Sequence, residues 1–467
     1  MQPRESLTVV GTMTGTSMDG IDVDLMITDG DQQVNEVGHF SLSYTDNCKI
    51  ILKAAEFAIR KRMGVMEAAR AYYPQAIRDY LIREVNVSEM EVDSKLEELS
   101  AYLYGTESVH SAITLDDVIR HSTDLHAIAV KKLLEEMGYV ASEIDVVGYH
   151  GQTMFHKPSI GKSVIVGDGQ ALADQLGITV VNDFRSNDVA AGGQGAPFAP
   201  LYHQALAKRD GKIPMAVVNC GGIANITLIK NENPLDLIAY DVGPGNGLID
   251  KLVKQRTSNK ENMDANGYYG LRGKVHEHLL DVLYEKSIIR EGQSYFSMPP
   301  PKSLDIGDMQ LIEELNPLSL EDACATLEAF TAYTIIKSLE SLNVKLSRQW
   351  VLAGGGWNNP VIRRELDSRL KQLLNQQVDI RTADEMGWNS QGLEAQIFAY
   401  LAVRSLNNEP LSVPGTTRVP KPLSGGHAYV PTQQEPTQKV KKLLDVNPAV
   451  LSGYREETIS KKEFVMA

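Results

Sequence analysis

Thr8-Val-Val-Gly-Thr-Met-Thr-Gly-Thr-Ser-Met-Asp-Gly-Ile-Asp-Val-Asp-Leu-Met-Ile27 is the most informative segment of this chain, because a similar pattern returns later. It predicts an apolar strand, a tight turn of Gly, Thr and Ser that carries Asp19, and a second strand. Further along, Met215-Ala-Val-Val-Asn-Cys-Gly-Gly-Ile-Ala-Asn-Ile-Thr-Leu-Ile229 predicts the same arrangement around a Gly-Gly turn. Two such hairpins predict a duplicated core. Turns that present successive backbone N–H groups can bind phosphate oxygens, so the two turns could clamp a nucleotide across a cleft.

A third glycine-rich element follows the two hairpins. Trp350-Val-Leu-Ala-Gly-Gly-Gly-Trp-Asn-Asn-Pro-Val-Ile-Arg-Arg-Glu365 predicts an apolar strand, a triple-glycine turn and a helix. Pro360 lies near the helix start, where its missing N–H costs nothing, and glycines let a base or ribose approach the backbone closely. One such turn alone is ordinarily just a hairpin or a strand-to-helix loop. Three of them on three apolar strands favour nucleotide binding, although none matches the P-loop and no G-x-G-x-x-G follows a strand.

We therefore predict that the nucleotide cofactor binds to these three turns. The residues expected to contact it are Gly15, Thr16, Ser17, Met18, Asp19 and Gly20 in the first, Asn219, Gly221, Gly222 and Asn225 in the second, and Gly354, Gly355 and Gly356 in the third.

The bulk composition is that of a soluble globular protein. The chain has 467 residues, enough for two or three domains, with 43% hydrophobic and 23% charged residues. Its net charge of -14 argues against a nucleic-acid partner, which needs a basic face. No signal-peptide pattern and no membrane-spanning apolar run is visible. Three scattered cysteines without metal-ligand spacing indicate a reducing compartment, so a cytoplasmic location is expected.

Strands that alternate with helices predict a mostly parallel or mixed sheet in an α/β fold. We expect a first domain over residues 1–205, with an acidic insertion near 85–121, a second over 206–408, and an extended surface tail over 409–467. The predicted strands are 144–150, 163–168 and 178–183, and the predicted helices are 122–137, 171–176, 320–342 and 392–403. Gly138 is expected to end the first of these helices, and Ser319 to cap the third with Asp322 completing a capping box.

Several long motifs, in order, resemble those of the anhydro-N-acetylmuramic acid kinases and the related fungal levoglucosan kinases. The motifs are Gly11-Thr-Met-Thr-Gly-Thr-Ser-Met-Asp-Gly-Ile-Asp22, Tyr149-His-Gly-Gln-Thr153, Asp183-Phe-Arg-Ser-Asn-Asp-Val-Ala-Ala-Gly-Gly-Gln-Gly-Ala-Pro197, Asn219-Cys-Gly-Gly-Ile-Ala-Asn225 and Asp241-Val-Gly-Pro-Gly-Asn246. The resemblance covers residues 8–405. It implies an α/β, actin/hexokinase-like (ASKHA) two-domain fold with a duplicated core and a central cleft. It also implies ATP, Mg²⁺ and a small anhydrosugar substrate.

The resemblance implies that Asp183 is catalytic. In the family's coupled reaction this residue deprotonates a water that attacks the anomeric carbon, and the freed ring-bridge oxygen takes the γ-phosphate. Asp183 follows an apolar strand, where α/β sheets place ligands. The alternative is a structural role, either as a helix N-cap or in an ion pair with Arg185. That alternative is stronger for Asp188, which we do not predict to be catalytic.

Two acids are candidate metal ligands. Asp19 is expected to meet a hydrated Mg²⁺, which prefers one or two carboxylates plus water, although an Asp before Gly is also simply a good turn residue. Glu394 is a weaker candidate, since an acid at a helix start is favourable anyway. The predicted substrate-binding residues are His150, Gln152, Asp168, Arg185, Asp241 and Asn246. For His150 a purely structural role is an equal alternative.

One departure bears on the substrate. The family usually reads P-P-K-S-T-G-R-E where this chain has Pro300-Pro-Lys-Ser-Leu-Asp-Ile-Gly307, so an arginine that could hold a carboxylate is missing. With the acidic insertion and the net charge, this favours a neutral anhydrosugar such as levoglucosan over the muramic sugar; Arg185 is the counter-argument. Two other functions stay open: an ordinary sugar or polyol kinase, and an actin-like ATPase that acts on a protein partner. A homodimer is compatible with the sequence.

Overall fold

A computed structural model of the protein describes residues 4–15, 17–105, 112–290 and 292–452. The chain divides into two compact units, each assembled from separate segments. Unit 1 comprises Met1–Gly195, Gln391–Leu411 and Leu423–Ala467, and unit 2 comprises Ala196–Ser390 and Ser412–Pro422. The boundary expected near residue 205 therefore lies at residue 195, because α7 (Ala199–Arg209) packs on strand β9 (Ile223–Ile229) of unit 2.

Unit 1 is built on a six-stranded sheet in the order β15-β7-β4-β1-β2-β3. The strands are β1 Leu7–Met13, β2 Gly20–Thr28, β3 Val34–Ser43, β4 Val146–Tyr149, β7 Thr179–Asn182 and β15 His427–Tyr429. β1 pairs antiparallel with β2, and β2 antiparallel with β3. On its other side β1 pairs parallel with β4, which pairs parallel with β7.

Unit 2 repeats this arrangement in a five-stranded sheet with the order β10-β9-β8-β13-β14. Besides β9, its strands are β8 Met215–Cys220, β10 Ile238–Pro244, β13 Gln349–Ala353 and β14 Asp379–Thr382. β8 and β9 form an antiparallel hairpin, β10 continues it antiparallel, and β13 and β14 add on in parallel. The five strands of this sheet match β3, β2, β1, β4 and β7 of unit 1 in order and direction, which confirms the predicted duplication and the actin/hexokinase-like α/β class.

One predicted strand lies outside the main sheets. The segment 163–168 was predicted as a further strand of a mostly parallel or mixed sheet, but β6 (Lys162–Val166) pairs antiparallel with β5 (Gln152–Lys157) in a separate two-stranded ribbon. The turn between them is short, with Gly161 in a left-handed conformation, and a short connection favours an antiparallel hairpin over a parallel crossover. A second ribbon, of β11 (Ile289–Arg290) and β12 (Gln293–Ser294), lies in unit 2.

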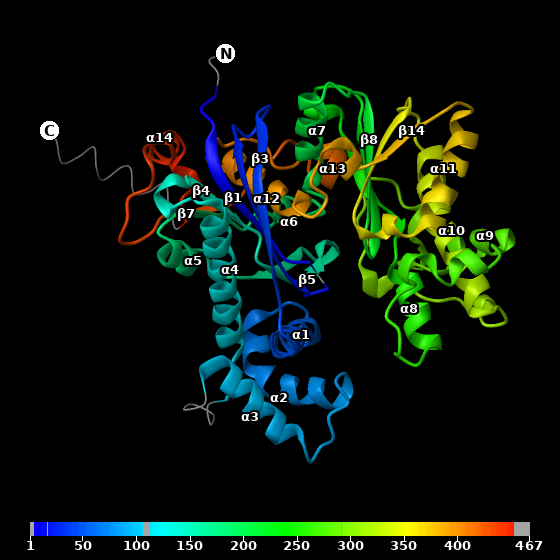
Figure 1. Ribbon diagram of the computed structural model, residues 1–467, viewed down its shortest axis with the longest axis horizontal. Coiled ribbons are helices and arrows are strands. Elements are labelled where there is room, and N and C mark those ends of the chain that lie inside the picture. Colours follow the sequence, from blue (N-terminus) through cyan, green and yellow to red (C-terminus); the bar gives the residue numbers. More distant parts are fainter. Residues whose placement is uncertain (1–3, 16, 106–111, 291, 453–467) are drawn as a thin grey trace. The chain divides into compact units, whose positions relative to one another are not determined.

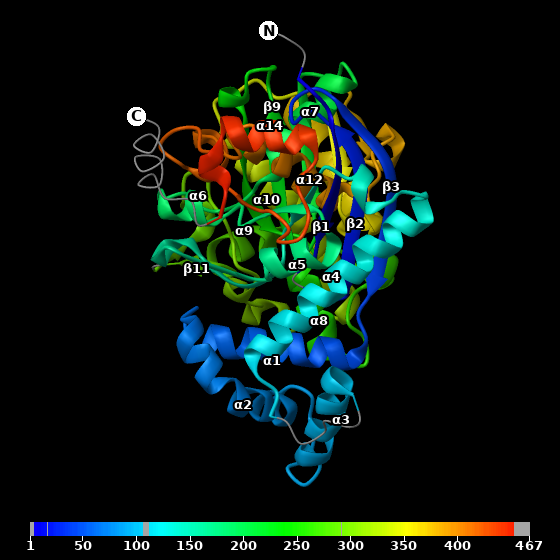
Figure 2. The same cartoon turned by 90° about the vertical axis from the view of Figure 1, so that its left-hand side faces the viewer.

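The helices of unit 1 begin and end at readable signals. They are α1 Asp46–Lys61, α2 Met66–Arg83, α3 Val92–Tyr104, α4 Leu115–Met137, α5 Gly169–Leu176, α6 Ser186–Ala190, α12 Leu393–Leu406 and α14 Gln438–Val446. α4 begins earlier than predicted because Thr114 and Asp117 form a capping box, and it ends at Gly138 as expected. Figures 1 and 2 show α1, α2 and α3 gathered at one end of unit 1, with α4 running from them to the sheet.

The helices of unit 2, besides α7, are α8 Gly247–Arg256, α9 Glu277–Lys286, α10 Leu320–Glu340, α11 Pro360–Leu374 and α13 Pro414–Thr417. Ser319 caps α10 as predicted by accepting the Asp322 N–H at 3.0 Å. The Asp322 carboxylate is directed elsewhere, to the Lys274 N–H and to His276. α11 begins at Pro360, with Asn359 as its cap.

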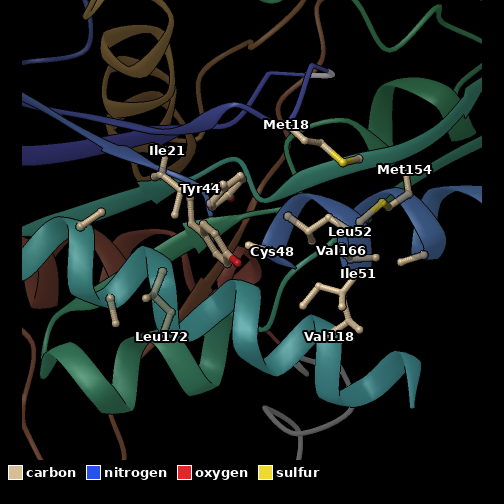
Figure 3. Close-up of a cluster of buried hydrophobic side chains, with 14 of the residues drawn as sticks. Met18, Ile21, Tyr44, Cys48, Ile51, Leu52, Val118, Met154, Val166 and Leu172 are labelled. Carbon is tan, nitrogen blue, oxygen red and sulfur yellow. The ribbon is translucent and has the colours of Figure 1, made fainter. Parts of the chain in front are cut away.

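The segment 85–121 is part of the core of unit 1 instead of an addition to it. Val92, Leu99, Leu115 and Val118 are buried in the same cluster as the sheet residues. Figure 3 shows Val118 beside Ile51 and Leu52 of α1, in the cluster that also holds Met18. The many acids along this segment lie on its outer faces, which is why it resembles an insertion when read as sequence. Part of it, residues 106–111, lies outside the described residues.

α12 belongs to unit 1, although it was expected in the second domain. Its backbone rests directly on two neighbouring glycines of the unit 1 sheet, Gly11 and Gly148, which are register partners on β1 and β4. A Cβ atom on Gly11 would lie 1.9 Å from the Ala395 carbonyl oxygen, and one on Gly148 would lie 2.1 Å from that of Phe398. The helix can approach the sheet this closely only because both positions lack a side chain.

The segment after residue 408 is folded into both units, in contrast to the predicted surface tail. β15 extends the unit 1 sheet by pairing with β7, and α14 packs against α12. Before both of these elements, residues 412–422 belong to unit 2, where α13 lies against β10. Val413, Val419, Ala428 and Val440 are fully buried. These apolar side chains, spaced among prolines and glycines, hold the segment in place.

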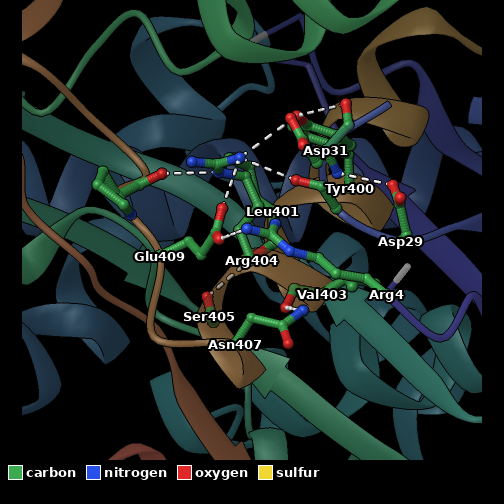
Figure 4. Close-up of polar contacts among 12 residues, drawn as sticks. Arg4, Asp29, Asp31, Tyr400, Leu401, Val403, Arg404, Ser405, Asn407 and Glu409 are labelled. Carbon is green, nitrogen blue, oxygen red and sulfur yellow. Dashed lines mark hydrogen bonds and ion pairs between the residues drawn. The ribbon is translucent and has the colours of Figure 1, made fainter. Parts of the chain in front are cut away.

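A buried ion-pair network fixes the end of α12 (Figure 4). Arg404, only 6% exposed, pairs with Glu409 at 3.1 Å and donates to the carbonyl oxygens of Gly30 and Pro410. Glu409 also pairs with Arg4 near the start of the chain. Within the described part of the chain, Cys48, Cys220 and Cys324 are buried free thiols, and no helix there is long and apolar enough to cross a membrane.

Candidate functional site

The first hairpin turn, residues 14–19, is anchored to the core of unit 1 on one side and exposed to solvent on the other. Met18 has a left-handed backbone (φ +57°) and its side chain is buried in the core. The Asp19 carbonyl oxygen accepts the Tyr44 N–H at 2.9 Å. Ser17 is exposed, and the Asp19 side chain is 76% exposed. The predicted cofactor contact Thr16 lies outside the described residues. Among its described residues, the turn therefore offers the Ser17 hydroxyl and the Asp19 carboxylate to solvent.

Gly20 and Gln152, two predicted contacts near this turn, have clear structural roles. A Cβ on Gly20 would lie 2.4 Å from the Leu42 carbonyl oxygen, so the glycine is needed for the pairing of β2 with β3. Gln152 is fully buried, and its amide donates to the Gly15 carbonyl oxygen at 3.1 Å. Thr14 adds a bond to the Gly151 carbonyl oxygen at 2.7 Å. Gln152 thus stabilises the backbone of the turn through this hydrogen bond. Its direct contact with a sugar stays a prediction.

Asp183 follows β7 directly and has a left-handed backbone, with φ +58°. For a non-glycine residue this conformation costs on the order of 1 kcal/mol, and such strain gathers at functional sites. Ser186 donates to its Oδ1 at 2.5 Å, and His427 lies 4.0 Å from its Oδ2. The carboxylate is 36% exposed. Arg185, not Asp183, is the residue before α6, so the N-cap alternative is not borne out.

Arg185 and His150 contact each other beneath Asp183. Arg185 donates to the Gly195 carbonyl oxygen at 2.5 Å, and its other guanidinium nitrogen lies 3.2 Å from His150 Nε2. Because arginine can only donate, His150 accepts through Nε2 and is neutral. Burial, followed by the Arg185 charge, lowers the pKa of His150 well below its usual value. His150 is 3% exposed and packs on Phe398, which supports its structural alternative.

Asp188 and Asp168 have the structural roles that carboxylates often take near helix ends. Asp188 is 2% exposed and accepts the Gly195 N–H at 2.6 Å, closing the glycine-rich loop after α6. Asp168 caps α5 by accepting the Ala171 N–H at 2.9 Å. The predicted sugar contact of Asp168 is therefore untested, and its carboxylate is already engaged.

Glu394 lies at the start of α12, among charged groups of the first sheet. Its side chain is exposed on unit 1. Desolvation by the surrounding protein is the main cause that raises its pKa, and the negative charge of Asp22 raises it further. The positive charge of Arg185 opposes this shift. Burial lowers the pKa of Arg185 to about 10, so this residue stays charged at neutral pH, with Asp188 and Glu394 favouring its charge. Asp22, Arg185 and Glu394 thus form one electrostatic group.

The Asp19 carboxylate is suited to a metal ion that keeps most of its water ligands. Among the described residues no group of three or more His, Cys, Asp or Glu side chains has a metal-binding arrangement. Asp19 offers an exposed carboxylate whose ion-pair partner, Lys49, is 3.8 Å away. Mg²⁺ usually keeps several waters and takes only one or two protein carboxylates, so a single exposed aspartate at a turn is compatible with it.

The second hairpin turn, residues 221–222, is tightly packed within unit 2. The Gly221 N–H donates to the Ile223 carbonyl oxygen at 3.1 Å. The Gly221 and Gly222 carbonyl oxygens accept from the start of α8, including the Asn246 N–H at 2.7 Å. Since the Gly221 N–H is already bonded, the predicted phosphate contact of this turn stays a prediction.

The third turn lies directly against the second. Gly354 has φ +89°, and a Cβ there would lie 2.5 Å from Asn219 Oδ1. A Cβ on Gly356 would lie 2.4 Å from Cys220 Sγ and 3.1 Å from Asn246 Oδ1. Gly355 alone faces open space, with no atom within 4 Å of such a Cβ. The structure thus brings two of the predicted cofactor turns and Asn246 together and leaves Gly355 accessible.

Three predicted polar residues form a row across unit 2. Asn219, Asn225 and Asp241 are register partners on β8, β9 and β10, so their side chains lie on one face of the sheet. Burial raises the pKa of Asp241 to about 7, and the Leu304 N–H, which donates to its Oδ2 at 2.7 Å, opposes the rise.

The segment that departs from the family pattern touches this site. The Leu304 N–H donates to the Asp241 carboxylate. The Ile306 side chain lies against Gly222, because a Cβ there would be only 2.8 Å from it. Ile306 therefore covers the second turn in place of a charged side chain. Lys302 is buried and donates to the carbonyl oxygens of Tyr295 and Phe296, so its role is structural.

Two residues near the unit 1 site were missed by sequence reasoning. His427 reaches Asp183 only because β15 pairs with β7, and the tail containing it was interpreted as surface chain. Asp22 was quoted within the first motif but not assigned a role. Its place on β2, two residues after Gly20, was the available signal: alternate residues of a strand share a face.

Comparisons with known proteins agree with the motifs. A family model described as anhydro-N-acetylmuramic acid kinase matches residues 95–431. A protein of that name from Methylobacterium nodulans is 37% identical over 428 residues, covering 89% of this chain and 98% of its own. Similar proteins of the same name come from Zymomonas mobilis, at 38% identity over 90% of this chain and 99% of its own, and from Rhizorhabdus wittichii, at 38% over 90% and 98%.

Proposed function

Because the chain belongs to the anhydro-N-acetylmuramic acid kinase family, we propose that it is an ATP-dependent kinase that opens and phosphorylates a 1,6-anhydrosugar. Kinases of this family are phosphotransferases with an alcohol group as acceptor, and this chain is an enzyme of that class. The observation that carries the proposed chemistry is Asp183: a half-exposed carboxylate on a strained backbone, at the end of a central strand.

Asp183 would act as the general base. A water molecule bound to its carboxylate gives up a proton to Asp183 as the water oxygen attacks C1 of the sugar. The C1–O6 bond breaks, and O6 attacks the γ-phosphorus of ATP, releasing ADP. The products are therefore a sugar 6-phosphate, ADP and a proton. A carboxylate suits the step because its negative charge also stabilises a developing oxocarbenium ion.

The first hairpin turn would hold the phosphates. Its fixed backbone and the Ser17 hydroxyl supply donors, and the exposed Asp19 carboxylate would hold a water of the Mg²⁺ ion bound to ATP. When bound, that ion neutralises charge on the transferred phosphoryl group. Arg185 and Glu394 lie beside this chemistry as charged groups of unit 1. Within unit 2, Gly355 would offer accessible backbone to a nucleotide.

We propose 1,6-anhydro-N-acetylmuramic acid as the substrate, since the relatives along nearly the whole chain carry that name. The neutral sugar favoured from the sequence finds no support among these relatives. One observation keeps levoglucosan as the alternative: Ile306 lies on the second turn where the family pattern has an arginine. We also infer a cytoplasmic location, which suits three buried free thiols.

The test is ADP release in a coupled assay with a panel of sugars. We expect turnover only with an anhydrosugar, and a higher kcat/KM for the muramic sugar than for levoglucosan at equal ATP. Preference for levoglucosan would overturn the substrate but not the kinase. Turnover with an ordinary hexose would indicate a simple sugar kinase, and sugar-independent ADP release would indicate an ATPase.

A further inference from the structure

A carboxyl group buried in unit 2 has no role in the proposed chemistry. Glu328 lies in the middle of α10 and is 0% exposed. Its Oε1 accepts a hydrogen bond from the Asn359 side-chain amide at 2.6 Å. Its Oε2 is buried and has no donor among the described residues. A charged carboxylate in this position would be costly, because a buried charge needs a full set of partners.

The loop that carries a second carboxylate, Asp264, lies against Oε2, because a Cβ on Gly270 would be 1.7 Å from this oxygen. Asp264 is 6% exposed and is one cause of the raised pKa of Glu328. Asp264 already accepts the Tyr269 N–H at 2.8 Å and the Gly270 N–H at 2.9 Å. Both oxygens of Asp264 thus accept a backbone hydrogen bond, whereas Oε2 of Glu328 accepts none from the described residues. Two carboxylates can share a hydrogen bond only through a proton, and the proton therefore resides on Glu328.

The surrounding charges do not remove the need for this proton. The titratable or charged groups that face Glu328 are Asp264 on the loop before Gly270, Arg364 on α11 and Cys324 on α10 itself. Arg364 is the only cation among these three, and its side chain is 59% exposed, so solvent screens it. Burial first, and the bond to Asp264 second, raise the pKa of Glu328 to about 9.

The same carboxyl group is linked to the third glycine turn. Asn359, which binds Glu328, donates its backbone N–H to the Gly356 carbonyl oxygen at 3.1 Å. Its side-chain oxygen caps α11 by accepting the Val361 N–H at 2.9 Å. A Cβ on Gly267 would lie 2.8 Å from that oxygen, so the loop that carries Asp264 also presses on Asn359.

We propose that Glu328, as a neutral carboxylic acid shared between Asp264 and Asn359, is a positioning residue that fixes the turn Gly354–Gly356 and thereby makes nucleotide binding sensitive to pH. Loss of the proton leaves two carboxylates in contact, which separates the loop at Asp264 from α10 and frees Asn359 to shift. The nucleotide part of this proposal rests on the proposed kinase function, whereas the proton itself does not.

The test compares the full-length protein with the Glu328→Gln variant from pH 6 to about pH 9.5. Glutamine donates to Asp264 and accepts from Asn359 as the neutral acid does, but it does not titrate. Between the unfolded pKa near 4.5 and the folded pKa near 9 the native state binds one more proton than the unfolded chain, so stability falls as pH rises. We expect the Tm of the variant minus that of the parent to increase steadily with pH. Glu340→Gln, at the exposed end of the same helix, is the control and should show no such trend.

Nucleotide binding is measured on the same samples with a non-hydrolysable ATP analogue. We expect the parent to lose affinity by on the order of fivefold relative to Glu328→Gln as pH rises past 9. Asn359→Ser keeps a capping side chain for α11 but removes the amide that binds Glu328. This variant should keep the pH trend in Tm and lose the pH trend in affinity.

The outcomes separate the parts of the proposal. Parallel Tm profiles for the parent and Glu328→Gln would overturn the buried proton. A rise in the parent's Tm on adding K⁺, Na⁺ or Ca²⁺ salts, absent in Glu328→Gln, would mean that a cation and not a proton lies between the carboxylates, which also overturns it. Diverging Tm profiles with identical affinity profiles would overturn the positioning role. A parent that binds no nucleotide at any pH contradicts the kinase proposal, while the Tm comparison still decides the proton.

Discussion

The turns at residues 14–19 and 221–222 occupy the same place in two sheets that share a five-strand order, yet they have opposite characters. The first is long enough to display side chains, and it leaves Ser17 and Asp19 exposed above a buried anchor at Met18. The second consists of two glycines whose backbone is bonded to the start of α8, and the residue before them, Cys220, is packed against Gly354 and Gly356. The two sheets thus share their strand order, while their turns differ in length. The longer turn of unit 1 exposes side chains, and the shorter turn of unit 2 allows close backbone packing.

The largest expected effect tests the chemical half of this comparison. Asp183→Asn keeps the shape of the side chain and removes its basicity, so we expect kcat to fall by about 10²–10⁴. Affinity for an ATP analogue should stay within a few-fold of the parent's. Steady-state kinetics and titration calorimetry measure the two quantities. Ser186→Ala, which removes only the hydroxyl bound to Asp183, is the control and should retain most activity. An Asn variant with more than half the parent's turnover would exclude Asp183 as the base.

The packing half is tested by two neighbouring glycines. Gly354→Ala forces a side chain into a left-handed backbone and against Asn219, so we expect the free energy of unfolding to fall by about 2 kcal/mol or more. Gly355→Ala meets no atom and should change stability by less than about 0.5 kcal/mol. If Gly355 faces the nucleotide, that variant should instead raise the KM for ATP. Equal losses of stability in urea titrations of the two variants would contradict the arrangement of the turns.

Asp19→Ala tests whether the first turn has a metal role. We expect the Mg²⁺ concentration for half-maximal activity to rise by about tenfold, because the exposed carboxylate is lost. The KM for the sugar should hardly change. Lys49→Ala removes the cation near Asp19 without touching the carboxylate, so it serves as the control. The same half-saturation in Asp19→Ala and the parent would remove Asp19 from the metal site.

The smallest effect concerns His150, whose two interpretations were evenly balanced. Burial and the charge of Arg185 lower the pKa of His150. Below the ordinary histidine pKa of 6.5, the unfolded chain therefore binds a proton at this residue that the native state does not bind. The parent should therefore lose stability as pH falls through this value. His150→Gln can still accept from Arg185 and does not titrate, so its Tm should fall less between neutral pH and about pH 5.5. A large rise in the KM for the sugar would instead support direct substrate contact.

The duplicated core was predictable because its signals are local. Each hairpin has two apolar runs around a glycine turn, and the caps at Ser319, Gly138 and Pro360 are set by residues close in sequence. The roles of α12 and of the segment after residue 408 were not predictable. What decides them is the missing side chain at Gly11 and Gly148, which matters only once β1 and β4 are neighbours. The segment 85–121 was likewise not predictable as core, because its many acids dominate the sequence pattern and the burial of Leu99 and Leu115 is decided by distant neighbours.

Site residues were predictable by type more than by role. The motifs indicated Asp183, Arg185 and the glycine turns, and the structure brings the second and third turns together. Sequence could not separate Asp168 and Gln152, which support a helix and a turn, from residues that display their side chains. Polar residues of both kinds follow apolar strands. Only the direction of each side chain distinguishes them, and this depends on partners far away in the chain.

The crossings of the chain between the units have a consequence for the order in which the protein can fold during synthesis. The unit 2 sheet is complete once residue 382 has been made. The unit 1 sheet begins at residue 7, but the helix that covers Gly11 and Gly148 ends at residue 406, and its edge strand ends at residue 429. The oldest part of the nascent chain therefore waits longest with an apolar face uncovered, a situation that favours aggregation or chaperone binding. A polypeptide released after residue 382 would hold a complete unit 2 sheet and an incomplete unit 1 sheet.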